Sequence, residues 1–161
     1  MPIVEVRKDT KALTMTVVAQ FAAPVARVWA AYADPRQLER FWGPPEWPAT
    51  FTRHDFKVGG RSEYVMNGPK GETSRGFWEF LSIEEPRAFE VKDGFLAPDG
   101  KQALNMPTMQ MRFTFEPHAD GTRMVTVTTF PSLEALEQLL GMGMEEGMKA
   151  AMAQIDDVLA A

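Results

Sequence analysis

The residues best suited to acid–base chemistry lie near the middle of the chain, where a histidine is followed by charged and phenolic side chains. His54 ends a predicted strand, Asp55 follows it directly, and Glu63 and Tyr64 belong to the next strand. A histidine titrates near neutral pH and can act as a general base. Adjacent strand residues point to opposite faces, so Asp55 is poorly placed to orient His54. We therefore expect a structural or surface role for His54 and assign no catalytic residue.

Other reactive patterns are missing from the sequence. The chain has no cysteine, which excludes thiolate nucleophiles, disulfides and thiolate metal sites. Its two histidines are far apart, and no serine lies in a Gly-x-Ser-x-Gly motif. The glycine pair Gly59-Gly60 opens no phosphate-binding pattern. We expect neither a metal nor a cofactor.

Methionine and aromatic residues form the strongest candidate site. The chain contains 11 methionines among 161 residues. Methionine is flexible and adapts to varied apolar shapes, whereas Trp and Tyr add a polar tip. These residues could simply form a packed core, but the excess of methionine favours the wall of an adaptable cavity. The predicted ligand-binding residues, with His54 at the cavity mouth, are Trp42, Trp47, His54, Tyr64, Met66, Trp78, Met109, Met111, Met144, Met148 and Met152.

Short strands separated by turn residues must position this set. Residues 109–116 alternate apolar and polar side chains without a break, which indicates one buried and one exposed face. In residues 73–83 large apolar side chains point to both sides, so we expect a bulge or a covered outer face. The expected strands are 13–21, 49–54, 61–67, 73–83, 87–95, 109–116 and 122–130, after an uncertain first segment at 3–6. The last six form an antiparallel meander.

Helical spacing appears in two places. Pro24 and Pro35 each begin a short helix after the first strand, and Asp34 with Gln37 has the pattern of a capping box. Near the carboxy terminus, Ser132 caps a helix that we expect to end at Gly141. Residues 144–159 then form a long amphipathic helix, with methionines on one arc and charged residues on the opposite arc.

A sheet with one apolar face must be covered, and this last helix carries the long apolar stripe that could cover it. The sequence thus predicts an α+β helix-grip (START-like) fold. In this fold a curved antiparallel sheet is wrapped around a long carboxy-terminal helix, and two short helices follow the first strand. The 161 residues fit one such domain, 1–161.

Several motifs resemble a known family, the bacterial proteins similar to the Hsp90-ATPase activator homologue within the START-like (SRPBCC) superfamily. The matching segments are Pro24-Val-Ala-Arg-Val-Trp29, Asp34-Pro35, Phe41-Trp42-Gly43-Pro44, Asp55-Phe-Lys-Val-Gly-Gly60, Ile83-Glu-Glu-Pro-Arg87 and Gly143-Met-Glu-Glu-Gly147. The resemblance implies a hydrophobic cavity between the helix and the sheet.

Three functions fit this expectation. The first is binding of a small hydrophobic or aromatic ligand, such as a lipid, without catalysis. The second is an enzyme that resembles polyketide cyclases and dehydratases, in which an inward titratable group moves a proton. The third is a co-chaperone of the Hsp90 type or another interaction protein.

Charge and hydropathy limit the partners. The net charge of -5 and the lack of a basic cluster argue against nucleic acid as a partner. No apolar run approaches the roughly 20 residues of a membrane-spanning helix, and the first ten residues lack a signal-peptide core. We expect a cytoplasmic protein without membrane insertion, whose partner is a small apolar or aromatic molecule, and we leave a homodimer open.

Overall fold

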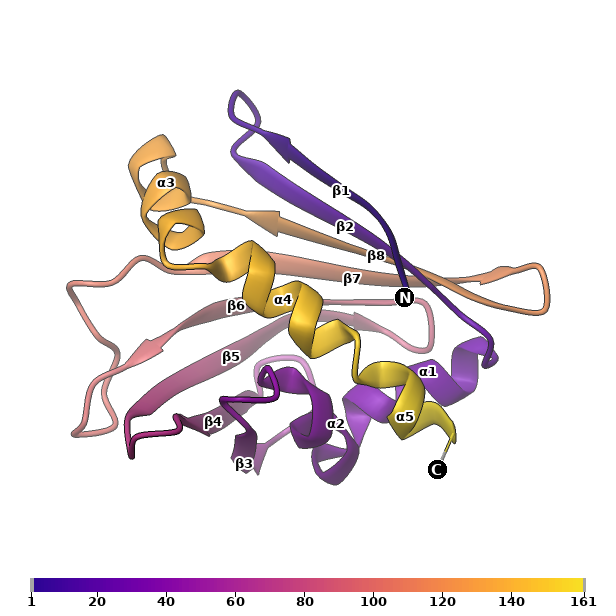
Figure 1. Cartoon of the computed structure of the whole chain (residues 1–161), viewed down its shortest axis with the longest axis horizontal. Coiled ribbons are helices and arrows are strands. Elements are labelled where there is room, and N and C mark those ends of the chain that lie inside the picture. Colours follow the sequence, from indigo (N-terminus) through magenta and orange to yellow (C-terminus); the bar gives the residue numbers. More distant parts are fainter. Residues whose placement is uncertain (1, 161) are drawn as a thin grey trace.

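One antiparallel sheet of eight strands dominates the computed structural model, which describes residues 2–160 (Figure 1). The order of the strands across the sheet is β1-β2-β8-β7-β6-β5-β4-β3, so β3 to β8 form the predicted six-strand meander. The strands are β1 (Ile3–Asp9), β2 (Thr14–Phe21), β3 (Ala49–His54), β4 (Arg61–Asn67), β5 (Thr73–Glu84), β6 (Ala88–Leu96), β7 (Met109–His118) and β8 (Gly121–Thr129). The first segment, expected at residues 3–6, is the edge strand β1 and extends to Asp9.

Side-chain alternation sets the two faces of the sheet. In β7, Met109, Met111, Phe113 and Phe115 are buried on the inner face, as the sequence pattern predicts. The predicted irregularity of β5 is also present, because its register against β6 shifts between Phe80 and Ser82. The inner face therefore presents a continuous apolar surface to the helices.

Two short helices, α1 (Val25–Ala33) and α2 (Pro35–Trp42), follow β2 and pack near one end of the sheet (Figure 1). Asp34 caps α2: its Oδ1 accepts a hydrogen bond from the backbone N–H of Arg36, and its Oδ2 accepts one from Gln37 Nε2, each at 2.9 Å. The predicted N-cap is confirmed, but Gln37 bonds the Asp34 carboxylate rather than its backbone N–H, so the reciprocal capping box is not formed. Tyr32 of α1 and Phe41 of α2 meet edge to face at 5.1 Å between ring centroids.

The carboxy-terminal segment corrects the prediction of a single long helix. The structure has α3 (Leu133–Gly141), α4 (Met144–Met152) and α5 (Ile155–Ala160). Helix α4 ends at Met152. Just beyond it, the N–H of Gln154 bonds to the carbonyl of Ala151, three residues back, and the Gln154 side chain donates to the carbonyl of Gly43 at 2.8 Å. The helix that begins after Ser132 ends at Gly141, as expected, and the left-handed residue between α3 and α4 is Gly143, with φ of 89°.

Helix α4 lies across the inner face of the sheet (Figure 1). Its Glu145 accepts a hydrogen bond from Lys8 of β1 at 2.6 Å and pairs with Lys149 at 2.9 Å. The bond from Lys8 joins α4 to the edge strand β1, and the apolar arc of α4 faces the strands. The grip of the sheet on its carboxy-terminal helix is as predicted, with the interruption between α4 and α5 as the difference.

Candidate functional site

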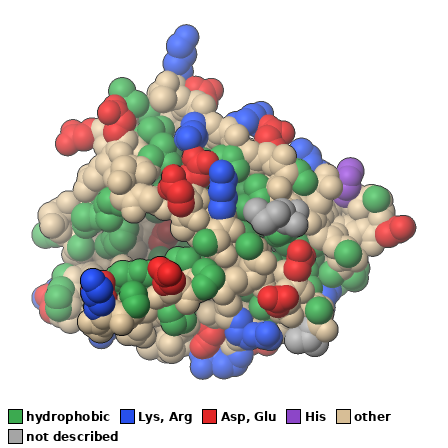
Figure 2. All heavy atoms as spheres, viewed as in Figure 1, with side chains coloured by type: hydrophobic (Ala, Val, Ile, Leu, Met, Phe, Trp, Pro, Cys, Tyr) green, Lys and Arg blue, Asp and Glu red, His purple; other side chains and the backbone are tan. Residues whose placement is uncertain are grey.

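A cavity of about 230 Å³ lies between α4 and the inner face of the sheet. Figure 2 shows it as a hollow bordered by hydrophobic side chains. Helix α4 forms one wall with Met144, Gly147, Met148, Ala151 and Met152. The opposite wall comes from β7, and the aromatic residues at the end of α2 close one side. The cavity is therefore predominantly apolar, as small-molecule sites are.

Eight of the eleven predicted ligand-binding residues line this cavity. They come from α2, β4, β7 and α4, so only the folded chain brings them together. They are Trp42, Tyr64, Met66, Met109, Met111, Met144, Met148 and Met152. Their contact with a ligand remains a prediction.

The structure does not bring Trp47, Trp78 and His54 to the cavity wall. Trp78 is fully buried and packs behind Trp42, with 4.8 Å between the ring centroids. Trp47 covers Gly68, where an added Cβ would lie 2.8 Å from the indole ring. Trp78 therefore belongs to the core behind the cavity wall, whereas the half-buried Trp47 packs on the turn at Gly68.

His54 connects three elements. Its Nε2 donates to the carbonyl oxygen of Tyr32 at 3.1 Å, and its Nδ1 lies 2.7 Å from Ser62 Oγ. Burial lowers the pKa of His54, so the neutral ring is favoured. Asp55 instead accepts from Arg53 at 2.7 Å. The structural role expected for His54 agrees with this geometry.

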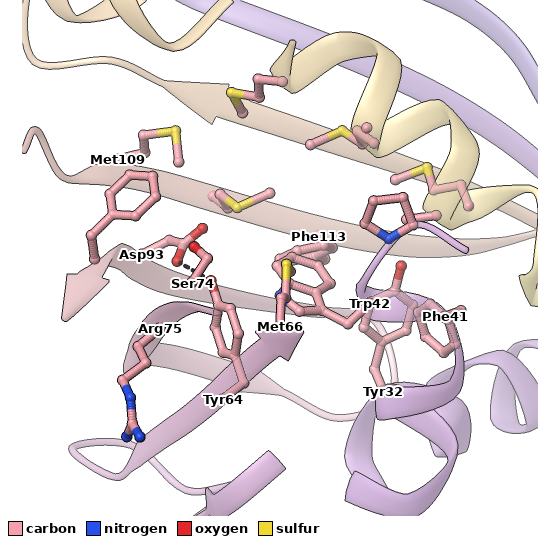
Figure 3. A pocket seen from close by; sticks show the side chains of 18 residues that line it. Tyr32, Phe41, Trp42, Tyr64, Met66, Ser74, Arg75, Asp93, Met109 and Phe113 are labelled. Carbon is pink, nitrogen blue, oxygen red and sulfur yellow. Dashed lines mark hydrogen bonds between the residues drawn. The ribbon is translucent and has the colours of Figure 1, made fainter. Parts of the chain in front are cut away.

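The polar end of the cavity consists of Tyr64 and Asp93 (Figure 3). Tyr64 Oη donates to Asp93 Oδ1 at 3.0 Å, and the side chain of Asp93 is buried. Burial raises the pKa of Asp93 to about 7, although the hydrogen bonds from Tyr64 and the Gly94 N–H act in the opposite direction. Burial and the adjacent carboxyl raise the pKa of Tyr64, which therefore remains a hydrogen-bond donor.

Sequence reasoning missed Asp93. A signal was present, because in the expected strand 87–95 this carboxyl occupies the same face as Phe89, Val91 and Phe95. An acidic side chain on the apolar face of a strand is buried at a cost unless it is hydrogen-bonded. The alternation of the strand alone therefore marks this position as a candidate functional residue.

Gly76 leaves the space that the Tyr64 ring occupies when it contacts Asp93. Tyr64 on β4 pairs with Gly76 on β5, and an added Cβ at Gly76 would lie 2.4 Å from Tyr64 Oη. The phenol ring therefore lies over the glycine and reaches across β5 to Asp93 on β6. A side chain at this position would occupy the space of the ring.

We expect Gly76→Ala to displace the Tyr64 ring and to lower the free energy of unfolding by about 1–3 kcal/mol, the usual cost of overpacking. Urea denaturation measures this loss. Gly141→Ala is the matched control, since an added Cβ there meets nothing within 4 Å. Equal stability of Gly76→Ala and the wild type would contradict the described packing of Tyr64.

No cluster of three or more His, Cys, Asp or Glu suited to a metal ion occurs within residues 2–160. In the same range no helix is long and apolar enough to cross a membrane. The groups present in the cavity can hold an apolar body and form directed hydrogen bonds at one end.

Comparisons with known proteins place this geometry in a family. Residues 22–160 match the family described as Activator of Hsp90 ATPase homolog 1-like protein. No curated protein matches the chain significantly.

Two solved structures are similar over almost the whole chain. Protein Ms6760 from Mycobacterium smegmatis is 47% identical with a TM-score of 0.91, and the alignment covers 98% of this chain and 97% of that one. A protein from Arthrobacter aurescens is 48% identical with a TM-score of 0.94, covering 98% and 91%. CalU16 from Micromonospora echinospora, 18% identical with a TM-score of 0.59 over 91% and 75%, shares the fold alone.

The family match covers most of the chain and agrees with the helix-grip architecture and with the motifs first noted in the sequence. The chain belongs to the family of Activator of Hsp90 ATPase homolog 1-like proteins.

Proposed function

We propose that the protein binds a small hydrophobic or aromatic molecule in the cavity between the sheet and α4. The observation that carries this proposal is an apolar space of about 230 Å³ with a buried polar pair at one end. A dry apolar cavity of about 150 Å³ is sufficient for benzene. The larger volume here suits a substituted single ring or a fused two-ring compound.

Gly147 supports a binding role because it keeps part of the cavity open. It lies inside α4 and lines the cavity, and an added Cβ there meets nothing within 4 Å. A glycine in a helix interior costs about 1 kcal/mol relative to alanine. The helix thus contains a residue of low helix propensity at a position where any side chain would reduce the space for a ligand.

We expect Gly147→Leu to weaken binding of 1-naphthylmethanol at least about tenfold, because the leucine side chain fills space that the probe needs. The variant should be no less stable than the wild type, since leucine favours the helix. Titration followed by NMR chemical shifts measures the affinity, and thermal unfolding measures the stability.

Gly141→Leu is the matched control for this experiment. Gly141 also has free space around its Cβ, but it lies in α3 and does not line the cavity. Binding should be unchanged in this variant. Equal affinities of Gly147→Leu and the wild type would show that the probe binds elsewhere, which would contradict the proposal.

A second candidate function, the cyclase- or dehydratase-like enzyme, is favoured by one observation. It requires an inward titratable group, and both Tyr64 and Asp93 line the cavity. The pKa of Asp93, about 7, suits a general acid or base near neutral pH. Mass spectrometry separates the two functions: a binder releases the ligand unchanged, whereas an enzyme converts it and loses this ability in Asp93→Asn.

A further inference from the structure

We propose that the natural ligand carries a basic nitrogen, and that the cavity binds small aromatic or alicyclic amines as ammonium ions with the Asp93 carboxylate as counter-ion. The inference rests on the proposed ligand-binding function and specifies the chemical class of the ligand. Three features of the cavity carry it: the direction of its hydrogen bonds, the unpaired charge of Asp93 and the aromatic walls.

The polar end of the cavity presents hydrogen-bond acceptors. Tyr64 uses its only proton in the hydrogen bond to Asp93 Oδ1. The hydroxyl oxygen of Tyr64 and the carboxylate then retain free lone pairs, and Ser74 adds a further hydroxyl at the same end (Figure 3). A ligand group that donates hydrogen bonds satisfies these lone pairs, and an ammonium group donates up to three.

Asp93 has no cationic partner within the described residues: none of the ion pairs there includes it. The residue is 94% buried, since 6% of its surface remains exposed. Arg75 lines the cavity, but its guanidinium points away from Asp93 (Figure 3). A buried carboxylate without a counter-charge is costly, and a ligand cation would supply the missing charge.

The walls suit the rest of such a ligand. Phe41, Trp42 and Phe113 line the cavity, and aromatic faces attract cations as well as aromatic rings. The indole nitrogen of Trp42 is shielded, and its N–H faces the Tyr64 hydroxyl, where its hydrogen bonding acts to lower the pKa of Tyr64, so it offers no donor to a ligand. The methionines of α4 and β7 adapt to the apolar body.

The protonation of Asp93 gives this interaction a defined pH dependence. The pKa of Tyr64 on β4, which faces Asp93, is well above neutral pH. The neighbouring strand β5 contributes Ser74 and Arg75, whose guanidinium points outward, and β7 and α4 contribute methionines. The affinity for an ammonium ion should therefore rise as the pH rises through about 7, where Asp93 ionises. It should fall again only above the pKa of the amine.

The test compares three probes of nearly the same shape: 1-naphthylmethylamine, 1-naphthylmethanol and 1-ethylnaphthalene. Their affinities for the full chain are measured at pH 8 and pH 5.5 by NMR titration. We expect the amine to bind at least about tenfold more tightly than the other two at pH 8. This preference should decrease about tenfold for each pH unit below the pKa of Asp93.

Asp93→Asn should abolish the preference for the amine, measured as the ratio of its affinity to that of 1-ethylnaphthalene for the same variant. Glu90→Gln is the matched control, because it makes the same carboxyl-to-amide change on the outer face of β6 and should keep the preference. A thermal unfolding curve verifies that each variant folds.

The outcomes separate the two proposals. If 1-ethylnaphthalene or the alcohol binds in the cavity as tightly as the amine, the amine inference is overturned and the binding function stands. If the amine preference persists in Asp93→Asn, the inference is also overturned. If none of the three probes binds, the ligand-binding function itself fails, and the amine inference fails with it.

Discussion

The free energy of unfolding of Asp93→Asn should increase relative to that of the wild type as the pH rises from about 4 to about 7. The carboxyl of Asp93 has its pKa raised from 3.8 to about 7 in the folded state, chiefly by burial. Between these values the folded protein holds a proton that the unfolded chain has lost, so the stability of the wild type decreases with rising pH. The decrease is complete above the folded-state pKa and amounts to on the order of 4 kcal/mol.

Urea denaturation of the wild type and Asp93→Asn at intervals between pH 4 and pH 8 measures this effect. The informative quantity is the difference in free energy of unfolding between the two proteins, since other titrating groups affect both. Glu90→Gln again serves as the matched control on the outer face of β6. A difference between wild type and Asp93→Asn that stays constant over this range would show that Asp93 titrates normally and is not buried as described.

Trp78→Ala should lower the free energy of unfolding by about 3–5 kcal/mol, the range for truncating a large aromatic residue in a core. Trp78 is fully buried and packs against Trp42 at 4.8 Å and against Phe89 and Phe113, each at 6.0 Å, between ring centroids. Removing it leaves a space behind the cavity wall that the surrounding rings cannot fill without moving.

Met148→Ala is the control that distinguishes truncation of a cavity-wall residue from truncation of a core residue. Met148 lines the cavity and is half-buried, so its truncation should cost clearly less stability while changing the affinity for a naphthyl probe. Both variants are compared by urea denaturation and by titration with 1-naphthylmethanol. A Trp78→Ala protein as stable as Met148→Ala would contradict the core position of Trp78.

Much of the sheet could be predicted from the sequence because its signals are local. Turn residues separate the strands, and the alternation at 109–116 gives the buried face of β7 directly. The capping residues Asp34 and Ser132 were also identifiable, since each lies directly before the helix it caps. These features depend on neighbours within a few residues.

The break between α4 and α5 could not be predicted in the same way. The apolar spacing continues through Met152, Ile155 and Leu159 as it would in one straight helix. The feature that accompanies the break is the hydrogen bond from the Gln154 side chain to Gly43, a residue 111 positions away. Helical periodicity reports the buried arc but not a tertiary contact of this kind.

In the candidate site, too, the features set by nearby residues could be predicted and those set by distant contacts could not. Periodicity placed Met144, Met148 and Met152 on one arc, and all three line the cavity. It could not show that Trp78 lies behind Trp42, because alternation gives the face of a strand and not what covers it. The pair of Tyr64 and Asp93 spans 29 residues and depends on the side-by-side order of β4, β5 and β6.

A crystal structure of the protein grown with 1-naphthylmethylamine at pH 8 tests the ligand site most directly. We predict that the naphthyl ring lies between the methionines of α4 and the strands, with its nitrogen about 2.7–3.2 Å from a carboxylate oxygen of Asp93. A ring bound outside this cavity, or a cavity that stays empty at saturating amine, would contradict binding of the amine between the sheet and α4. A ring inside the cavity with its nitrogen turned away from Asp93 would contradict the role of that carboxylate.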